Sequence, residues 1–145
     1  MICEAEPKDL EALLSLYTQL HNNPMPVIDE SIYGIWHRIM EDPNHHIIVV
    51  KEDGHIISSC VLILVPNLTH NQRPYGVIEN VITHPGFRMK GYARACLDYA
   101  KELAQKAGCY KLMLMTGSKK ESTLRIYEKA GYNQQDKTAF IKWLE

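Results

Sequence analysis

One short stretch of the chain, residues 88–94, combines small and basic residues in a pattern that suits a phosphate group. Its members are Arg88, Met89, Lys90, Gly91, Tyr92, Ala93 and Arg94. The stretch lies where a helix is predicted to begin, and the first turn of a helix offers unpaired backbone N–H groups and the positive end of its dipole. Gly91 and Ala93 leave room for a ligand, and the three basic side chains add positive charge. The residues indicate an anion site, with a solvated basic helix start as the alternative.

Two well-known phosphate motifs do not account for this stretch. A dinucleotide fingerprint requires three glycines and a downstream acidic residue, and a Walker loop requires G-x-x-x-x-G-K-[ST]. Neither pattern occurs in the chain. The spacing alone therefore does not say which phosphate-bearing ligand is bound.

The composition is that of a globular protein with one domain, expected to span residues 1–145. The net charge of −1 argues against a broad nucleic-acid surface or an anionic-membrane surface. No apolar run approaches the ~20 residues that span a bilayer, and the acidic N-terminus does not resemble a signal peptide. Four cysteines without C-x-x-C spacing and scattered histidines predict reduced thiols, no metal and a cytoplasmic location.

Hydrophobic periodicity predicts a mixed sheet with helices packed on it, which is an α/β (α+β) fold. Strands are expected at residues 2–6, 46–52, 56–65, 76–83, 110–115 and 139–144. Helices are expected from Pro7 through about His21, after Asp29, from about Gly91 to Ala107, and over 121–130. Asp53-Gly54 predicts a two-residue hairpin turn, and residues 66–74 read as a polar loop.

Two motifs in this order resemble the GCN5-related N-acetyltransferase (GNAT) superfamily. The first runs from Thr83 to Ala93, after a strand and before the long helix, and resembles the pattern V-x-P-x-x-[RQ]-x-x-G-x-[GA]. The second, Leu124 to Tyr132, resembles Y-E-K-x-G-[FY]. The resemblance covers nearly the whole chain. It implies a mixed, mostly antiparallel central sheet flanked by helices.

The resemblance also implies acetyl-CoA as the cosubstrate. Residues 88–93, with Arg94 beside them, would hold the pyrophosphate through backbone N–H groups. Val81, Ile82 and Thr83 would pair with the pantetheine arm as if it were another strand. The Ile82 N–H is the expected oxyanion donor for the thioester carbonyl.

The chemistry of acetyl transfer assigns two further roles. Tyr127 is at the position of the family's acid, which protonates the leaving thiolate, and a core tyrosine is the alternative. Glu79 is the expected general base, acting directly or through water, because a carboxylate in an apolar strand is costly unless it is useful. An exposed or salt-bridged strand residue is the alternative for Glu79.

The chain departs from the family pattern near the second motif. Many members carry Asn seven residues before the tyrosine and Ala four before it, where this chain has Lys120 and Thr123. Lys120 is expected to reach a CoA phosphate instead. The family's use of its first two helices as a lid suggests a further set of substrate-binding residues. These are Tyr17, His21, Tyr33, Trp36 and Met115, with Tyr33 and Trp36 as core residues in the alternative.

The expected activity is acetylation of a primary amine on a small molecule. Residues 77–81 and 109–112 resemble glucosamine-6-phosphate N-acetyltransferases, which makes an amino sugar phosphate one candidate acceptor. The alternatives are a non-catalytic acyl-CoA-binding domain and an enzyme that acetylates a protein or peptide amine. Nucleic-acid binding is not expected. Family members are often dimers, so a homodimer is also expected.

Overall fold

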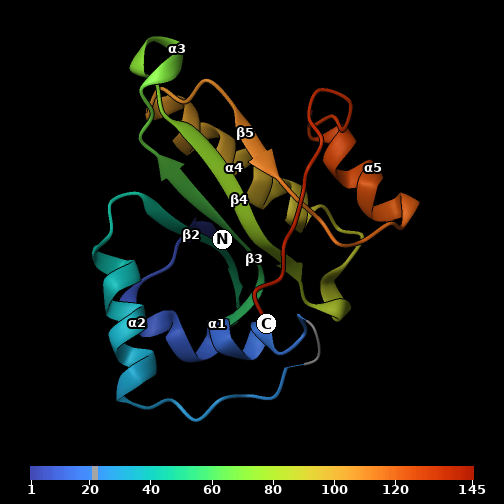
Figure 1. Cartoon of the computed structure of the whole chain (residues 1–145). Helices are drawn as coiled ribbons and strands as arrows, with labels where there is room; N and C mark the ends of the chain where they lie inside the picture. The colour runs from blue at the N-terminus through green and yellow to red at the C-terminus, as the bar shows by residue number, and fades with distance from the viewer. Residues whose placement is uncertain (21–22) are drawn as a thin grey trace.

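The computed structural model describes residues 1–20 and 23–145, and their strands form one five-stranded sheet in the order β1-β2-β3-β4-β5 (Figure 1). Neighbouring strands are antiparallel from β1 to β4, and β4 and β5 are parallel. The strands are β1 (Ile2–Glu4), β2 (His45–Glu52), β3 (His55–Val65), β4 (Tyr75–Thr83) and β5 (Leu112–Leu114). The mixed, mostly antiparallel sheet predicted from the sequence is confirmed.

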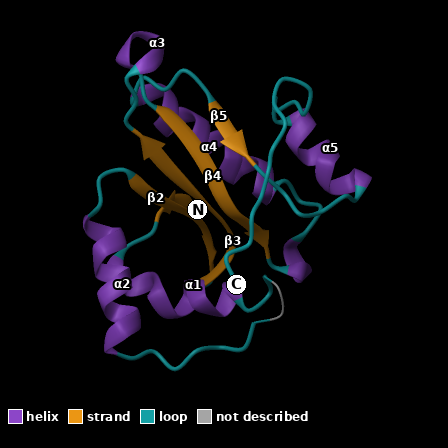
Figure 2. Cartoon of the chain, viewed as in Figure 1, coloured by secondary structure: helices purple, strands orange, loops and turns teal. Residues whose placement is uncertain are grey.

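Helices cover both faces of this sheet (Figure 2). The α-helices are α1 (Leu10–Tyr17), α2 (Glu30–Glu41), α3 (Thr69–Gln72), α4 (Tyr92–Lys106) and α5 (Glu121–Lys129), and short 3-10 turns occur at Pro7–Asp9 and Pro85–Phe87. Helices α1 and α2 pack on one face and α4 on the other. No helix among the described residues is long and apolar enough to cross a membrane.

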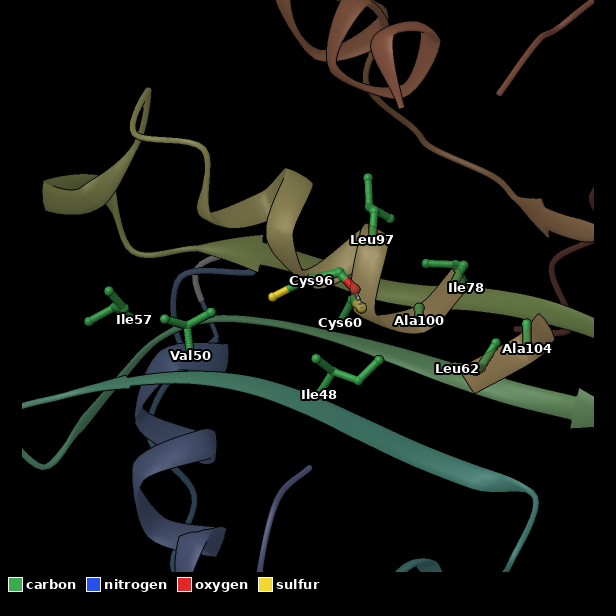
Figure 3. Close-up of a cluster of buried hydrophobic side chains, with 10 residues drawn as sticks. All are labelled: Ile48, Val50, Ile57, Cys60, Leu62, Ile78, Cys96, Leu97, Ala100 and Ala104. Atoms are coloured by element: carbon green, nitrogen blue, oxygen red, sulfur yellow. Dashed lines mark hydrogen bonds between the residues drawn. The ribbon is translucent and has the colours of Figure 1, made fainter. Parts of the chain in front are cut away.

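Alternation along β2 and β3 divides the core into two layers. Ile48 and Val50 face α4, whereas Ile47 and Val49 face α1 and α2. Successive strand residues point to opposite faces, so a strand buried on both faces reads as a continuous apolar run. Figure 3 shows the layer under α4, where Ala100 and Ala104 let the helix approach the sheet closely. The central strands therefore form a rigid support for their neighbours.

Local signals in the sequence position these elements as predicted. The Asp53 and Gly54 residues both have positive φ, of 50° and 78°, as a two-residue hairpin turn requires. The Asp29 side chain accepts a hydrogen bond from the Ile32 N–H and begins α2.

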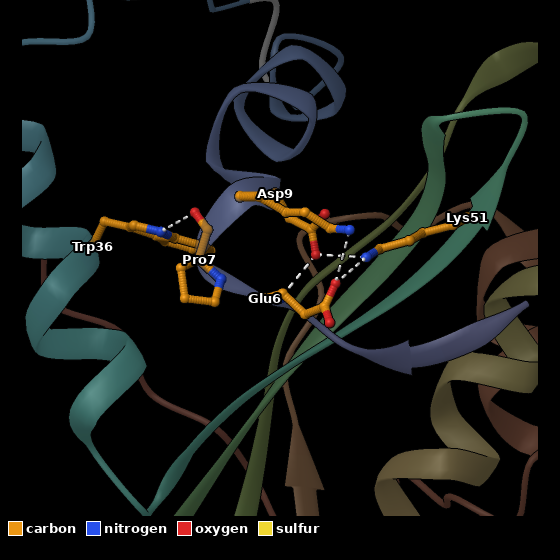
Figure 4. A network of polar contacts seen from close by, with 6 residues as sticks. Glu6, Pro7, Asp9, Trp36 and Lys51 are labelled. Carbon is orange, nitrogen blue, oxygen red and sulfur yellow. Dashed lines mark hydrogen bonds and ion pairs between the residues drawn. The ribbon is translucent and has the colours of Figure 1, made fainter.

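A polar network fixes the start of α1 against the sheet and α2 (Figure 4). Asp9 accepts from the Glu6 N–H at 2.7 Å and pairs with the Lys51 ammonium at 2.8 Å. Burial opposes ionisation of Asp9, but this hydrogen bond and the Lys51 charge together hold its pKa below the usual 3.8. The Trp36 indole donates to the Pro7 carbonyl at 3.0 Å.

The expected strand at 139–144 is wrong: residues 137–145 form neither helix nor strand, and Phe140, Trp143 and Leu144 are exposed. A strand needs a hydrogen-bonded neighbour, and this segment has none in its own sheet. The polar loop at 66–74 contains the short α3, whose His70 and Asn71 are left-handed. Helix α1 ends at Tyr17, and His21, which was expected near its end, lies outside the described residues.

Candidate active site

The centre of the candidate site is an irregularity in β4. Its register with β3 pairs Ser59 with Ile82 but Val61 with Glu79, so two β4 residues lie opposite Cys60 alone. This is a β-bulge, and its first residue, Asn80, has a left-handed φ of 51°. Asn is among the non-glycine residues that adopt this conformation most readily.

The bulge decides which amides of β4 face away from β3. The His84 N–H donates to the Ile57 carbonyl at 2.7 Å, so His84 is directed toward β3. Backbone groups alternate along a strand, so Ile82 also faces β3, and its carbonyl accepts from the Ser58 hydroxyl at 3.1 Å. By this alternation the Ile82 N–H points toward β3, so the oxyanion donor proposed below is a neighbouring amide of β4. The amides that face the other side are those of Val81 and Thr83.

Buried hydroxyl and thiol groups hold the bulged strand in this arrangement. The Ser58 hydroxyl donates to the Ile82 carbonyl and lies 2.8 Å from the Thr83 hydroxyl. The Cys96 thiol of α4 lies 3.7 Å from the same Ser58 oxygen. Since Ser58 is fully buried, each of these bonds forms without competition from water. This network fixes the end of β4 relative to β3 and α4.

Beyond the bulge, the β5 side of β4 is open. The two strands pair only over Gly76–Ile78 and Leu112–Leu114, and β5 ends there. Residues 79–83 of β4 therefore have no strand partner on that side. An extended ligand can pair with such an edge through main-chain hydrogen bonds. The Val81 and Thr83 amides lie on this edge.

The loop after β4 forms a second binding feature. Met89 and Gly91 are both left-handed, with φ of 65° and 85°, on either side of Lys90. Successive N–H groups curl inward where left- and right-handed residues alternate, and they form a concave site for an anion. The loop leads into α4, whose first turn has no side-chain cap. The loop thus combines two left-handed residues with a helix start that has no side-chain cap, a combination that suits an anion.

The basic side chains near this loop differ in how they are engaged. Arg88 is exposed and donates to the Thr83 carbonyl at 3.2 Å. The Lys90 ammonium lies 5.5 Å from the centre of the Phe87 ring. Arg94 donates to Asp98 and to the Lys129 carbonyl at 2.9 Å, so it ties α4 to α5. The exposed Lys120 lies at the start of α5.

Glu79 lies on the face of the sheet that carries α1 and α2. It pairs with Val61, which belongs to that face, and directly opposed residues in an antiparallel pair share a face. Glu79 is exposed, and no ion pair involves it among the described residues. Tyr17, at the end of α1, packs on this same face, and burial raises its pKa to about 12, an effect that the nearby Ser59 and Asn80 side chains oppose. A neutral tyrosine hydroxyl thus lies beside the bulge.

Tyr127 lies on the opposite face. Its ring packs against the core layer under α4, the layer that Val81 also contacts. Burial raises the pKa of Tyr127 above its usual value of 10.0. The phenol therefore stays protonated across the physiological range, as a proton donor must.

The other sequence-predicted substrate residues are dispersed. Tyr33 on α2 is 56% exposed, and Met115, which follows β5, is 59% exposed. Trp36 is buried and its only donor is used by Pro7, so the structure supports the core alternative for this residue. His21 lies outside the described residues. A hollow of about 470 Å³ lies between α1, the β2–β3 hairpin and the 84–87 turn, but it borders neither Glu79 nor Tyr127.

Sequence reasoning missed the residues that shape the bulge. The sequence patterns predict neither the left-handed Asn80 nor a role for Ser58, which lies within the strand expected at 56–65. A signal for each was available, because Asn tolerates positive φ and two adjacent serines interrupt the apolar run of β3. Buried hydroxyl groups need partners, and here the partners lie in β4 and β2.

Comparison with known proteins gives a family match. The model of the Acetyltransferase (GNAT) family matches residues 10–132. Glucosamine 6-phosphate N-acetyltransferase of Trypanosoma brucei brucei is 32% identical over 84 residues, which are 58% of this chain and 55% of that protein. A probable Drosophila melanogaster counterpart is 27% identical over 96 residues, 64% of this chain and 42% of that one. The chain spans about half the length of the curated relatives it matches.

Solved structures resemble the chain over its whole length. A protein from Agrobacterium tumefaciens assigned as an acetyltransferase has 35% identity and a TM-score of 0.91, with 99% of each chain covered. The glucosamine-6-phosphate N-acetyltransferase of Arabidopsis thaliana has 21% identity and a TM-score of 0.87, with 100% of this chain and 98% of that one covered. At that identity, the Arabidopsis structure supports the fold alone.

Proposed function

The chain belongs to the acetyltransferase (GNAT) family, and we propose that it transfers the acetyl group of acetyl-CoA to the primary amine of a small molecule. Enzymes of this family use acetyl-CoA as the acetyl donor. The observation that carries the proposal is the open edge of β4, which lies between the bulge at Asn80 and the anion-binding loop at 88–91.

The proposed binding mode uses backbone groups more than side chains. The Val81 and Thr83 amides pair with the pantetheine arm along the open edge. The N–H groups of residues 88–93 hold the pyrophosphate, and exposed Arg88, Lys90 and Lys120 add charge that attracts it. Arg94 acts by tying α4 to α5, which supports the position of Tyr127.

The proposed mechanism uses the two faces of the sheet for opposite proton transfers. The acceptor amine approaches from the α1 and α2 face, where Glu79 takes its proton directly or through water. The amine nitrogen then bonds to the acetyl carbon, and the Val81 N–H stabilises the negative charge that develops on the carbonyl oxygen. The carbon–sulfur bond breaks, and Tyr127 on the α4 face protonates the departing thiolate.

For the acceptor, we propose an amino sugar phosphate. Support comes from the similarity to the Trypanosoma glucosamine 6-phosphate N-acetyltransferase, which includes 58% of this chain. Tyr17, at the end of α1, lies on the face from which we propose that the amine enters. A neutral Tyr17 hydroxyl can donate to a sugar hydroxyl without adding charge.

The alternative from another class is a domain that binds acyl-CoA without turnover. It predicts that acetyl-CoA binds but that no amine releases CoA. The presence of an exposed carboxylate and a half-buried phenol on opposite faces of the sheet favours the enzyme. A third possibility, acetylation of a peptide amine, is tested by the same assay.

The test is a CoA-release assay across four classes of amine at fixed acetyl-CoA. Glucosamine 6-phosphate and glucosamine form a matched pair that isolates the phosphate; polyamines, amino acids and peptides form the remaining classes. We expect kcat/KM to be highest for the phosphorylated amino sugar. Turnover of peptides alone would replace the acceptor assignment, and binding without any turnover would contradict the enzymatic function.

A further inference from the structure

The hydroxyl group of Tyr132 is buried without a hydrogen-bond partner. Among the buried side-chain nitrogen and oxygen atoms of the residues that the structure describes, its oxygen alone has none. A buried polar group that stays unpaired is unfavourable, and such groups in folded proteins call for an explanation. A phenylalanine at this position would keep the ring and avoid that cost.

The end of α5 brings Tyr132 against Tyr127. Gly131, which follows the helix, has a left-handed φ of 98°, and its N–H donates to the Glu128 carbonyl at 3.0 Å. The Tyr132 N–H donates to the Tyr127 carbonyl, also at 3.0 Å. These two hydrogen bonds define a Schellman motif, in which the residue after the glycine commonly packs on the residue whose carbonyl it binds. The backbone therefore directs the unpaired hydroxyl toward the neighbourhood of the proposed acid.

The groups around Tyr132 leave Tyr127 as its available partner. Burial, followed by the charges of Cys60, Asp98 and Tyr127, raises the pKa of Tyr132 to about 12, so these three groups lie nearby. The Cys60 thiol already donates to a backbone carbonyl of α4 at 3.6 Å. Both oxygens of Asp98 accept from the Arg94 guanidinium, at 3.0 and 3.1 Å. The Tyr127 hydroxyl makes no hydrogen bond among the described residues.

We propose that Tyr132 is a positioning residue, whose hydroxyl donates a hydrogen bond to the Tyr127 oxygen after Tyr127 has given up its proton. This role rests on the acetyl transfer proposed above. When the carbon–sulfur bond breaks, the sulfur keeps the electron pair of that bond and takes the Tyr127 proton. The Tyr127 oxygen keeps the electron pair of its own O–H bond and carries the negative charge. It later regains a proton from water, which receives the proton that Glu79 removes from the amine.

The unpaired state of the resting enzyme is what makes the hydroxyl useful. Only an interaction that is stronger in the transition state than in the ground state raises kcat. The Tyr132 donor meets this condition, because its acceptor becomes ionised only as the thiolate leaves, and a hydrogen bond to an ionised oxygen is roughly twice as strong as a neutral one. The Schellman turn holds the donor in place before the charge develops, so little reorganisation is needed.

The first experiment removes this hydroxyl and keeps the ring. Tyr132→Phe should lower kcat about tenfold, as expected for a lost hydrogen bond to a charged group, and should leave KM for acetyl-CoA within about twofold of wild type. The urea midpoint should not fall, because the lost hydroxyl has no partner in the resting fold. Tyr99→Phe is the matched control, since this half-buried tyrosine also packs on the core layer under α4, and it should keep wild-type kcat. Wild-type kcat in Tyr132→Phe would overturn the proposal.

The second experiment asks whether Tyr132 acts through Tyr127. We expect Tyr132→Phe to have no further effect on kcat when it is added to Tyr127→Phe, because the acceptor of its hydrogen bond is then missing. A tenfold loss in both backgrounds would contradict the proposal and indicate a purely structural role. Absence of turnover in wild type would overturn both the enzymatic function and this role, whereas an active wild type with equal losses in both backgrounds would overturn this role alone.

Discussion

The two halves of the sheet are built from similar apolar residues but differ in how completely they are packed. The inner half, β2 and β3, is buried on both faces and carries the fully buried Ile48, Val49 and Leu62. The outer half, β4, β5 and α5, contains a bulge, an unpaired edge and no fully buried residue in β5 or α5. The inner half supplies stability, and the outer half supplies backbone groups that a ligand can use.

The comparison explains why the proposed chemistry sits at β4. This strand is held on one side by the inner half, through Ser58 and the β3 ladder, and is open on the other. A fully paired strand would have no amide to offer, and an unsupported one would not hold its amides in place. The predictions below separate the two halves by what each substitution should damage.

The largest expected effect is on stability in the inner half. Leu62→Ala removes a side chain with 0% exposure, and the resulting cavity should cost about 2–5 kcal/mol of unfolding free energy. Urea denaturation measures this loss, and Leu68→Ala, at an exposed site, should change it by less than about 0.5 kcal/mol. The kcat per folded molecule should stay the same in both. A large fall in kcat for Leu62→Ala would show that the inner half is not a passive support.

The next effect is on turnover in the outer half. Tyr127→Phe should lower kcat by about a hundredfold, because a positioned acid contributes about 10²–10⁴. Burial raises the pKa of Tyr127, so the wild-type phenol should keep its proton across the physiological pH range, and turnover should not decline there through loss of this proton. Stopped-flow and calorimetric measurements should find acetyl-CoA affinity within about twofold of wild type. An unchanged kcat would remove Tyr127 from the acid role.

A smaller loss of turnover is expected from a substitution of Glu79, which lies on the other face of the sheet. Glu79→Gln should lower kcat by roughly tenfold near neutral pH, and the deficit should shrink at alkaline pH, where the amine loses its proton without help. Glu102→Gln, which removes an exposed carboxylate from α4, is the matched control and should behave like wild type. Parallel rate profiles for Glu79→Gln and wild type at every pH would exclude the base role.

A substitution in the loop at 88–91 should change the affinity for acetyl-CoA. Gly91 has φ of 85°, where a side chain costs about 1–2 kcal/mol, so Gly91→Ala should weaken acetyl-CoA binding about fivefold or more. Gly34→Ala is the control, because Gly34 lies inside α2 with no atom within 4 Å of an added Cβ and no positive φ. Alanine there should raise stability by roughly 0.5–1 kcal/mol. Undiminished affinity in Gly91→Ala would show that the loop does not hold the ligand.

The smallest effect concerns the support for α1. Because the pKa of Asp9 is lowered from 3.8, its stabilising contribution is present above that value and is lost as the pH falls through the folded-state pKa. Asp9→Asn should therefore be less stable than wild type at pH 7, with the difference shrinking below about pH 4. Thermal unfolding from pH 3 to 7 measures it. A difference that grows toward acid would contradict the assignment.

Much of the architecture could be predicted from the sequence, because strong local signals specify it. The apolar runs of β2, β3 and β4, the Asp53-Gly54 turn and the Asp29 cap were all placed within a residue or two. The family was predicted from two motifs and is confirmed by the match over residues 10–132. Each of these signals resides in contiguous residues.

The parts that could not be predicted depend on partners distant in sequence. The bulge at Asn80 inserts one residue into a strand without changing the strand's composition. The directions in which the Val81 and Ile82 amides point are therefore seen only when the register with β3 is known. The 139–144 segment has the composition of a strand, but in the part of the chain that the structure describes no strand pairs with it. Trp36 could not be assigned to core or pocket until Pro7 was seen beside it.

The central claim is that the bulge turns the Val81 and Thr83 amides, and not that of Ile82, toward acetyl-CoA. Amide hydrogen exchange followed by NMR tests it residue by residue, with and without the ligand. We predict slow exchange at Ile82 in both states, and fast exchange at Val81 and Thr83 that becomes slow when acetyl-CoA binds. Protection gained at Ile82 instead, or none at Val81 and Thr83 in the saturated complex, would contradict the account.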